Sequence, residues 1–388
     1  GAGEWTHLYA NTGNTASTDD QWIHEDLALQ WFGGPGPRRM VDRHLRAPAP
    51  LVANGRLFIM GENTVIGVDA YNGTELWESK LPATQRYSMP YDAGYAATDG
   101  EQIYIAVRGE CWVLDAATGG LDRKLAHPGA DGVDGGHWGY AGLSAGRLYG
   151  TVQQSGASRQ APSRHQIDID YLSRQPVVTG RMFFCMDPVT GVQLWNHQRG
   201  VIVNTTVTIA DGRVYFIESL NDKAVAEASG RMPLELITAA DCHLVAVDAR
   251  SCDRVLDVPI DLSMCSNSLY LAYANRSLVL IGSGDSEEKD AQYYVRVFDG
   301  PSGHELWRAS HANGKPGALG HGEQVHHPVL LGETLVAEPV LYDQRTGRRL
   351  NPDSLDDSDP WFISRPGHSC GTMSGAGDCV FFRAGNPT

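Results

Sequence analysis

Short apolar runs separated by small polar turns follow one another along the whole chain. The first repeat is the clearest, with apolar runs at residues 51–53, 56–60, 65–68 and 75–77. Asn54-Gly55 separates the first two runs, and this dipeptide tolerates positive φ at both central positions of a two-residue hairpin. The pattern therefore predicts four short antiparallel strands joined by tight turns, which make one blade of a β-propeller.

A turn-and-strand motif repeats along the sequence. Residues 69–77, 187–195 and 299–307 each begin with Asp, carry Gly at the fifth position and end in Leu-Trp. Weaker copies begin at Asp115, Asp248 and Asp343. The Asp side chain can accept hydrogen bonds from nearby backbone N–H groups, and the Gly can adopt a left-handed conformation. Repetition at intervals of about 45–70 residues is typical of rings or arrays of similar units.

The turn between the first two strands gives an independent count of blades. It recurs at Asn54-Gly55, Asp99-Gly100, Ala145-Gly146, Asp211-Gly212, Asn275-Arg276, Leu331-Gly332 and Gly377-Asp378. We therefore expect an all-β protein, a β-propeller of four-stranded antiparallel blades. Seven blades are visible, and an eighth would come from a missing C-terminal part or from another chain. Residues 27–32 have the pattern of a fourth strand without its own blade, so we expect this N-terminal strand to close the ring.

The same pattern predicts one propeller domain over residues 1–388, with insertions at about 155–180 and 221–240. The first insertion is mostly polar and holds Pro162 and Pro176, which indicates a surface loop. In the second, residues 222–229 favour a short helix that ends at Gly230. Such loops could cap one face of the ring, or they could be tolerated surface insertions.

Composition limits the partners. The net charge of -15 argues against nucleic acid or an anionic membrane surface as the main partner. No apolar run approaches the roughly 20 residues that a membrane-spanning helix needs. Hydrophobic residues make up 42% of the chain and charged residues 20%, which is an ordered rather than a disordered composition. The expected partner is a protein or a small molecule.

Cysteines and tryptophans are interpreted mainly as structural residues. The seven cysteines include no C-x-x-C and no adjacent pair, so they form no familiar metal or haem motif. Cys370 and Cys379 could form a disulfide, whereas Cys111 and Cys185 lie in apolar runs and are expected in the core. One place in the repeat is shared by Trp31, Trp77, Trp195 and Trp307, where large rings would pack between adjacent blades.

Candidate functional residues come from the approach to each innermost strand, because these approaches meet at one mouth of the central channel. About 7–10 residues before each first turn of a blade stand His44, Tyr91, His137 with Trp138, Asn204, Cys265, His321 and His368. Their neighbours include Arg46, Thr205, Asn267, Glu323, His326, His327 and Cys370. Trp138 lies in a Gly-rich approach outside the repeat, so its ring could stack on a planar ligand.

Three interpretations of this mouth stay open. The residues could simply hydrogen-bond backbone and water in a polar channel mouth. They could bind an organic ligand, for which the candidates are His44, Arg46, Tyr91, His137, Trp138, Asn204, Asn267, Glu323 and His327. They could bind a metal, because imidazole suits Cu and Zn, and the metal candidates are His321, His326, His368 and Cys370.

The Asp-x-x-x-Gly-x-x-Leu-Trp repeat resembles the PQQ-like, quinoprotein-type β-propeller repeat, and the resemblance covers nearly the whole chain. The opening segment, residues 4–14, looks like the lead-in of bacterial members of that superfamily. The resemblance implies an exported protein, periplasmic or extracellular. It also implies one of two roles, since the family includes PQQ-dependent alcohol dehydrogenases and outer-membrane assembly lipoproteins that bind partners and no cofactor.

The cofactor does not follow from the resemblance. The dehydrogenases carry an adjacent-cysteine disulfide beside the quinone, and this chain has no Cys-Cys. The motifs give no Glu, Asn and Asp set for the family's metal and no catalytic Asp, so PQQ is not indicated and Cu, Zn or Ca stay candidates. We therefore expect a protein- or ligand-binding scaffold in a larger assembly. The alternative is a quinone- or metal-dependent oxidoreductase whose site is the His-rich mouth. A hydrolase or lyase is a third class, and neither a nucleophile elbow nor paired carboxylates support it.

Overall fold

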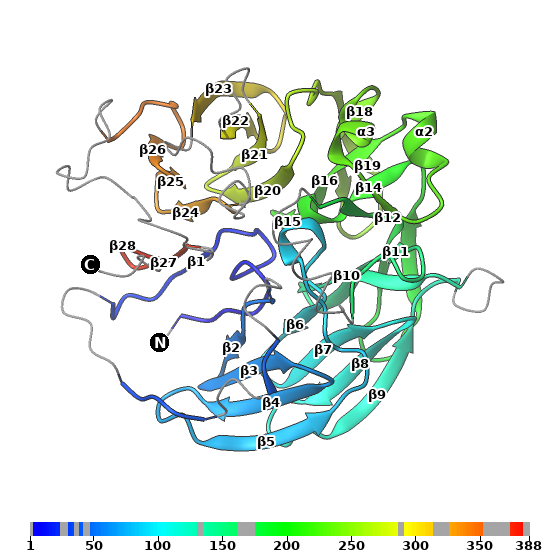
Figure 1. The fold of residues 1–388 in the computed structure, drawn as a ribbon, viewed down its shortest axis with the longest axis vertical. Coiled ribbons are helices and arrows are strands. Elements are labelled where there is room, and N and C mark those ends of the chain that lie inside the picture. Colours follow the sequence, from blue (N-terminus) through cyan, green and yellow to red (C-terminus); the bar gives the residue numbers. More distant parts are fainter. Residues whose placement is uncertain are drawn as a thin grey trace.

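The computed structural model describes residues 3–23, 30–34, 39–41, 47–129, 135–160, 175–285, 291–312, 326–351 and 373–382. Its sheets are arranged as a ring around a central axis (Figure 1). The predicted β-propeller is confirmed, and seven blades start where the repeated turns predict them.

Within each blade the strands are called A to D, from the axis outward. Blade 1 contains β2 (Leu51–Ala53), β3 (Arg56–Gly61), β4 (Thr64–Asp69) and β5 (Glu75–Lys80). Blade 2 contains β6 (Ala96–Thr98), β7 (Gln102–Val107), β8 (Glu110–Asp115) and β9 (Leu121–Ala126). Blade 3 contains β10 (His137–Ser144), β11 (Arg147–Gln153), β12 (Val177–Met186) and β13 (Gln193–His197).

Blade 4 contains β15 (Thr208–Ala210), β16 (Arg213–Ser219), β18 (Cys242–Asp248) and β19 (Arg254–Pro259). Blade 5 contains β20 (Ser268–Ala274), β21 (Ser277–Asp285), β22 (Ala291–Asp299) and β23 (Glu305–Ala312). Blade 6 contains β24 (Val329–Leu331), β25 (Thr334–Ala337) and β26 (Val340–Asp343). Blade 7 contains β27 (Ser374–Ala376) and β28 (Cys379–Phe381).

The second predicted insertion carries elements of its own. It forms α2 (Asp222–Val225), β17 (Arg231–Met232) and α3 (Leu234–Thr238), so the predicted helix is present but shorter than expected. Strand β17 pairs with β12, and β14 (Val201–Val203) pairs with both β12 and β16. These pairings join blades 3 and 4 into one ten-stranded sheet. Residues 161–174 of the first insertion lie outside the described residues.

The A–B and C–D turns have the predicted backbone chemistry. At Asn54-Gly55 the φ angles are 48° and 70°, as a two-residue hairpin with positive φ at both positions requires. In the turn that follows strand C, the Asp69 carboxylate accepts hydrogen bonds from the backbone N–H groups of Tyr71 and Asn72. In the corresponding turn of blade 4, Cys252 takes the place of the Gly with φ 67°.

The repeated tryptophans form the joints between blades, as predicted. Each indole N–H donates to a carbonyl of the next blade, at the residue that follows the turn Asp. The pairs are Trp31 with Ala70, Trp77 with Ala116, Trp195 with Ala249, and Trp307 with Gln344, at 2.9–3.2 Å. In blade 2 the same joint is made by Arg123, whose guanidinium donates to the Pro188 carbonyl at 2.7 and 3.0 Å.

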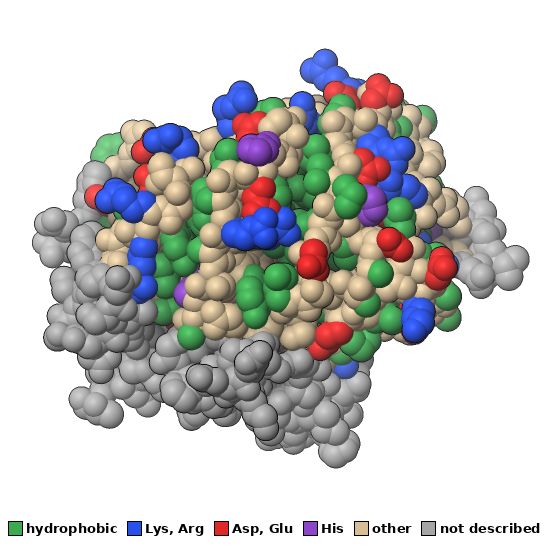
Figure 2. Space-filling view, turned by 90° about the horizontal axis from the view of Figure 1, so that it is seen from above, with side chains coloured by type: hydrophobic (Ala, Val, Ile, Leu, Met, Phe, Trp, Pro, Cys, Tyr) green, Lys and Arg blue, Asp and Glu red, His purple; other side chains and the backbone are tan. Residues whose placement is uncertain are grey.

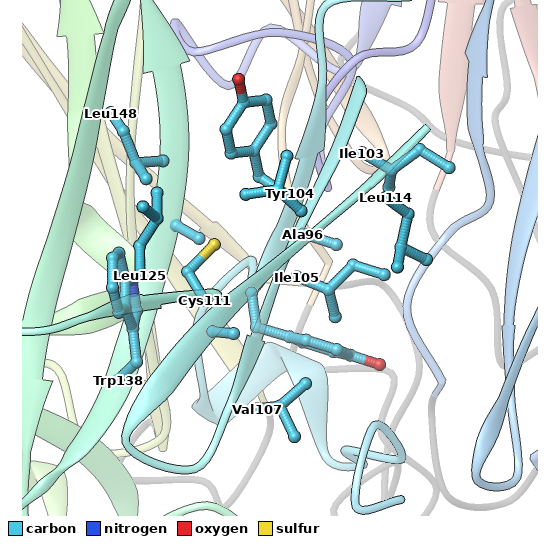
Figure 3. Packing of buried hydrophobic residues seen from close by; sticks show 14 of the residues in the cluster. Ala96, Ile103, Tyr104, Ile105, Val107, Cys111, Leu114, Leu125, Trp138 and Leu148 are labelled. Carbon is cyan, nitrogen blue, oxygen red and sulfur yellow. The ribbon is translucent and has the colours of Figure 1, made fainter. Parts of the chain in front are cut away.

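The core lies between neighbouring sheets. Figure 3 shows one such cluster, in which Tyr104, Ile105, Cys111 and Leu125 of blade 2 lie close to Trp138 and Leu148 of blade 3. Cys111 and Cys185 are fully buried, as their apolar runs predicted. Cys370 is not among the described residues, so its pairing with Cys379 stays a prediction.

The N-terminal segment at residues 5–18, called the hub, runs around the axis inside the ring of A strands (Figure 1). It accepts one backbone N–H from strand A of every blade, in chain order. The donors are Val52, Thr98, Leu143, Ile209, Tyr273, Leu330 and Gly375, at 2.7–3.1 Å. Six of these bonds end on hub carbonyls, and the bond from Leu143 ends on Nε2 of His7. The inner edges of all seven sheets are therefore tied to one segment.

An N-terminal strand joins the last sheet of the ring, as predicted. The strand that joins the last sheet is β1 (Ser17–Thr18), which pairs in parallel with β27 at the inner edge. Residues 27–29 of the segment predicted for this role lie outside the described residues, so the pairing of that segment with the last sheet stays a prediction. Trp31 of that segment is described, and its ring meets Gly73 of blade 1 as the other joint tryptophans meet their neighbours. Trp31 thus occupies the place that the repeat predicts, and β1, which the hydrophobic pattern did not mark, pairs at the inner edge of blade 7.

The contribution of the hub to stability can be measured by replacing Asn14. Its side-chain amide donates to the carbonyls of Val207 and Leu271 and to Thr208 Oγ1, at 2.8–3.1 Å. Replacing Asn14 with Gly removes three buried hydrogen bonds, and although the Leu271 carbonyl still accepts from Thr208 Oγ1 at 2.9 Å, the loss should cost about 1–3 kcal/mol of unfolding free energy. Asn63→Gly is the matched control, because Asn63 has the same φ of 54° but is exposed. Equal shifts of the denaturation midpoint in the two variants would show that the hub contacts contribute little.

Candidate functional site

The connections from strand D to the next strand A, together with the B–C connections, meet at one end of the axis, called the D–A mouth. Residues 84–95, between blades 1 and 2, form a segment called the plug, which includes the 3₁₀ turn η3 (Met89–Tyr91). The Tyr91 hydroxyl donates to Asn267 Oδ1 at 3.0 Å, and the Tyr270 hydroxyl donates to the Pro90 carbonyl at 3.2 Å. Asn267 and Tyr270 belong to the approach and A strand of blade 5, so the plug crosses the axis and covers the channel.

The space between the plug and the hub is small. A cavity of about 20 Å³ is lined by residues of both, including His7, Asn14 and Asp92, and by Asn204 from the approach to blade 4. Asp92 Oδ2 and Asn204 Oδ1 are buried and have no hydrogen-bond partner among the described residues. A cavity of this size admits one water molecule, which can donate hydrogen bonds to such oxygens. It does not admit an organic ligand.

The predicted site residues therefore separate into several environments. Tyr91 and Asn267 meet across the axis, whereas Asn204 donates to Gln153 Oε1 at 3.1 Å beside the cavity. His137 is half-buried, and its Nδ1 accepts from the Gly156 amide at 3.4 Å. Burial lowers the pKa of His137, and nearby Arg86 lowers it further. The predicted residues His44, Arg46, His321, Glu323, His368 and Cys370 lie outside the described residues.

Trp138 is a packing residue rather than a stacking platform at the surface. Its ring is fully buried and lies edge-on to Phe184, with ring centroids 4.9 Å apart. Its indole N–H donates to the Tyr140 carbonyl at 2.8 Å. The Gly-rich approach before it suggested an open platform, but blades 2 and 3 enclose the ring because the wedge between their sheets needs a large side chain.

The paired histidines at the approach to blade 6 point to different partners. His326 Nε2 lies 3.5 Å from Glu338 Oε2. The His327 ring stacks on Tyr9 of the hub at 3.6 Å, and its Nδ1 is 2.7 Å from the Pro328 carbonyl. Within the part of the chain that the structure describes, no group of three or more His, Cys, Asp or Glu residues could hold a metal.

The described channel also does not fit a quinone cofactor. The plug and the hub occupy the axis where strand A residues of all blades converge, and the cavity between them has room for water alone. No step of a mechanism is therefore assigned to such a group.

Arginines that the sequence analysis missed gather at the mouth. Arg86 in the plug is 1% exposed, donates to the Gly139 carbonyl at 2.9 Å, and lies 4.0 Å from Asp92 Oδ1. Its guanidinium also lies 4.8 Å from the centre of the Tyr95 ring, close enough for a cation–π contact. Arg86 lies five residues before Tyr91 but outside the positions that the repeat aligns, so no repeated pattern marks it.

Two further arginines lie close to the plug. Arg159, from the B–C connection of blade 3, accepts the Tyr87 amide with its carbonyl at 3.2 Å, and its guanidinium lies 5.9 Å from the Tyr87 ring. Arg231 lies on β17, opposite Val178 of β12. Burial lowers the pKa of Arg159 and Arg231, as it does for Arg86. All three remain charged at neutral pH because an arginine starts from a pKa above 12.

Comparison with known proteins agrees with this architecture. Residues 10–161 match the family model described as outer membrane protein assembly factor BamB. Among solved structures, a europium-containing methanol dehydrogenase matches with 11% identity and a TM-score of 0.53, over 96% of this chain and 87% of that chain. BamB from Moraxella catarrhalis matches with 13% identity and a TM-score of 0.42, over 92% and 84%. No curated protein matches the sequence significantly.

The class of protein is thus a β-propeller. Its repeats resemble those of the PQQ-like family, and a model of that family matches residues 10–161. The structural match at 11% identity supports the fold alone, so the role of the chain must come from its own residues. No helix in the described residues is long and apolar enough to cross a membrane.

Two buried histidines at the hub make stability depend on pH. Burial lowers the pKa of His7 to about 4 and that of His327 to about 3, from 6.5. Between pH 6.5 and 4 the unfolded chain therefore binds protons that the folded chain does not, so unfolding free energy should fall as pH decreases through this window. Each such histidine contributes at most about 1.4 kcal/mol per pH unit.

His7→Gln should reduce this slope, because Gln can still accept the Leu143 amide but does not titrate. The measurement is unfolding by denaturant at pH 7, 6, 5 and 4.5. Replacing the exposed His304 with Gln is the control and should leave the slope as in the parent. Identical slopes for the parent and His7→Gln would contradict this role of His7.

Proposed function

We propose that the chain acts as one β-propeller domain of an exported assembly and binds a protein or a small molecule at its D–A mouth. The observation that carries the proposal is the convergence of charged and aromatic side chains from separate blades at this mouth. Tyr87 of the plug contacts Arg159, and the charge of Arg231 also reaches Tyr87.

The anchoring of the mouth supports a binding role. The plug is fixed by hydrogen bonds to blades 3 and 5, and β17 is fixed by its pairing with β12. Side chains held by such contacts lose little freedom when a ligand binds, which favours recognition. The matched family description, outer membrane protein assembly factor, names a protein of this kind, and export of this chain is part of the proposal.

The alternative, an oxidoreductase, is distinguished by spectroscopy and turnover. The chain purified from its own source should carry no stoichiometric metal and no visible absorption band, and it should not reduce an artificial electron acceptor with alcohols. Elemental analysis, an absorption spectrum and a dye-reduction assay test this. A retained metal that is released by replacing His321 and His368, or steady dye reduction, would overturn the scaffold in favour of the alternative.

Binding at the mouth is tested separately with a photo-reactive amino acid. Placed at the exposed Lys223 on α2, it should give a cross-linked product of one defined mass in the native host. The matched control carries the same amino acid at Val255, which is 43% exposed on the outer strand β19. Equal products from both positions, or a product from Val255 alone, would place the binding surface elsewhere.

A further inference from the structure

The end of the axis opposite the D–A mouth is open. A cleft of about 570 Å³ lies there, where the hub meets the A–B turns of blades 3, 4 and 5. This volume is typical of sites for small organic ligands, whereas the cavity beneath the plug has room for water alone. The proposed binding role of the D–A mouth does not involve this cleft.

The inner side of the cleft offers hydrogen-bond donors. The Thr12 carbonyl of the hub accepts the Ile209 amide at 2.8 Å. The Gly13 carbonyl accepts the Tyr273 amide at 2.7 Å, so this part of the hub is fixed against blades 4 and 5. The N–H groups of Thr12 and Gly13 and the hydroxyls of Thr12 and Ser144 have no hydrogen-bond partner among the described residues. A ligand can therefore bond here without displacing an existing contact.

Two opposite charges line the cleft without pairing with each other. Asp211 Oδ2 accepts the Tyr273 hydroxyl at 2.6 Å, and within the described chain this carboxylate makes no ion pair. Burial and this hydrogen bond raise the pKa of Tyr273, so its hydroxyl stays protonated and continues to donate to Asp211. The Arg276 side chain is 69% exposed and pairs loosely with Asp299, with Nη2 3.7 Å from Oδ1. That distance is too long for a hydrogen bond, so the guanidinium keeps its donors for a ligand.

Charged side chains on the outer strands are arranged differently. Arg199, for example, is paired with both Glu218 and Asp257. Figure 2 shows this rim, where acidic and basic side chains lie next to one another. Opposite charges on the rim therefore satisfy each other, whereas Asp211 and Arg276 in the cleft do not.

We propose that this cleft binds a small zwitterion of the amino-acid class, which is a free amino acid or a short peptide. Arg276 binds the carboxylate, since a guanidinium presents N–H donors to both of its oxygens. Asp211 binds the ammonium group through Oδ1, the oxygen that the Tyr273 hydroxyl does not contact. A ligand with a single charge would meet a group of its own sign in the same cleft, and that repulsion selects against it.

The test uses the full chain in isothermal titration calorimetry at low salt, with glycine and triglycine as probes. Both carry two opposite charges, at a short and a long separation, so their comparison distinguishes a free amino acid from a peptide. At least one should bind, with a Kd on the order of 1 mM or tighter. The N-acetyl and the amide form of that probe each lack one charge, and each should bind about tenfold more weakly.

Two variants connect each charge of the probe with its partner. Arg276→Gln should bind the probe and its amide form equally, because the contact with the carboxylate is lost. Asp211→Asn keeps an oxygen that accepts the Tyr273 hydroxyl, and it should bind the probe and its N-acetyl form equally. General damage to the cleft would not remove these two preferences separately.

Arg345→Gln is the matched control, because Arg345 is exposed on the C–D turn of blade 6 and does not line the cleft. It should bind the probe and both derivatives as the parent does.

The proposal is wrong if neither glycine nor triglycine binds at about 10 mM, well above a Kd on the order of 1 mM. It is also wrong if binding depends on one charge alone, or if Arg345→Gln weakens binding as much as Arg276→Gln does. None of these results bears on the D–A mouth, whose role is tested by cross-linking at Lys223.

Discussion

The inner edges of the seven sheets are the constraint on which the rest of the structure depends. An unpaired strand edge exposes backbone N–H and C=O groups, and such groups must find partners when they are buried. Here the hub supplies an acceptor to strand A of each blade in turn, from Val52 in blade 1 to Gly375 in blade 7. One short segment thus fixes the spacing of blades that are distant in sequence.

The outer joints complement the hub. Each joint places a large side chain against the turn of the next blade, and four of them use Trp, of which Trp77, Trp195 and Trp307 lie on strand D. Blade 2 uses Arg123, and in blade 4 Leu256 lies against Gly303 of the next blade. The hub and these joints hold neighbouring blades at their inner and outer edges. The connections at the D–A mouth are therefore anchored to blades whose relative positions are fixed.

Much of this frame could be predicted from the sequence, because it depends on local chemistry. Asn54-Gly55 and the Asp69 turn have strong backbone preferences, and Trp77 marks strand D directly. The hub could not be predicted, since Thr12 and Gly13 contribute only backbone carbonyls and carry no side-chain pattern for that role. Arg123 was missed as a joint because its residue type differs from the repeated Trp.

The candidate site was predicted less well for the same reason. The position of Tyr91 and Asn267 in the repeat predicted that they lie at the same mouth, and the structure shows that they are hydrogen-bonded. That contact holds the plug across the channel. The arginines come from a plug and from a B–C insertion, and their convergence depends on how these segments fold over the ring. Sequence spacing does not report such long-range contacts. The D–A mouth is therefore a charged surface at the end of a channel that the plug closes.

Amide hydrogen exchange of the native chain tests the central claim most directly. The account predicts that the amides of Val52, Thr98, Leu143, Ile209, Tyr273, Leu330 and Gly375 are all strongly protected and lose their protection together in Asn14→Gly. Fast exchange at these amides in the intact chain, or loss of protection confined to blades 4 and 5 in the variant, would show that the hub does not hold the seven blades as one unit.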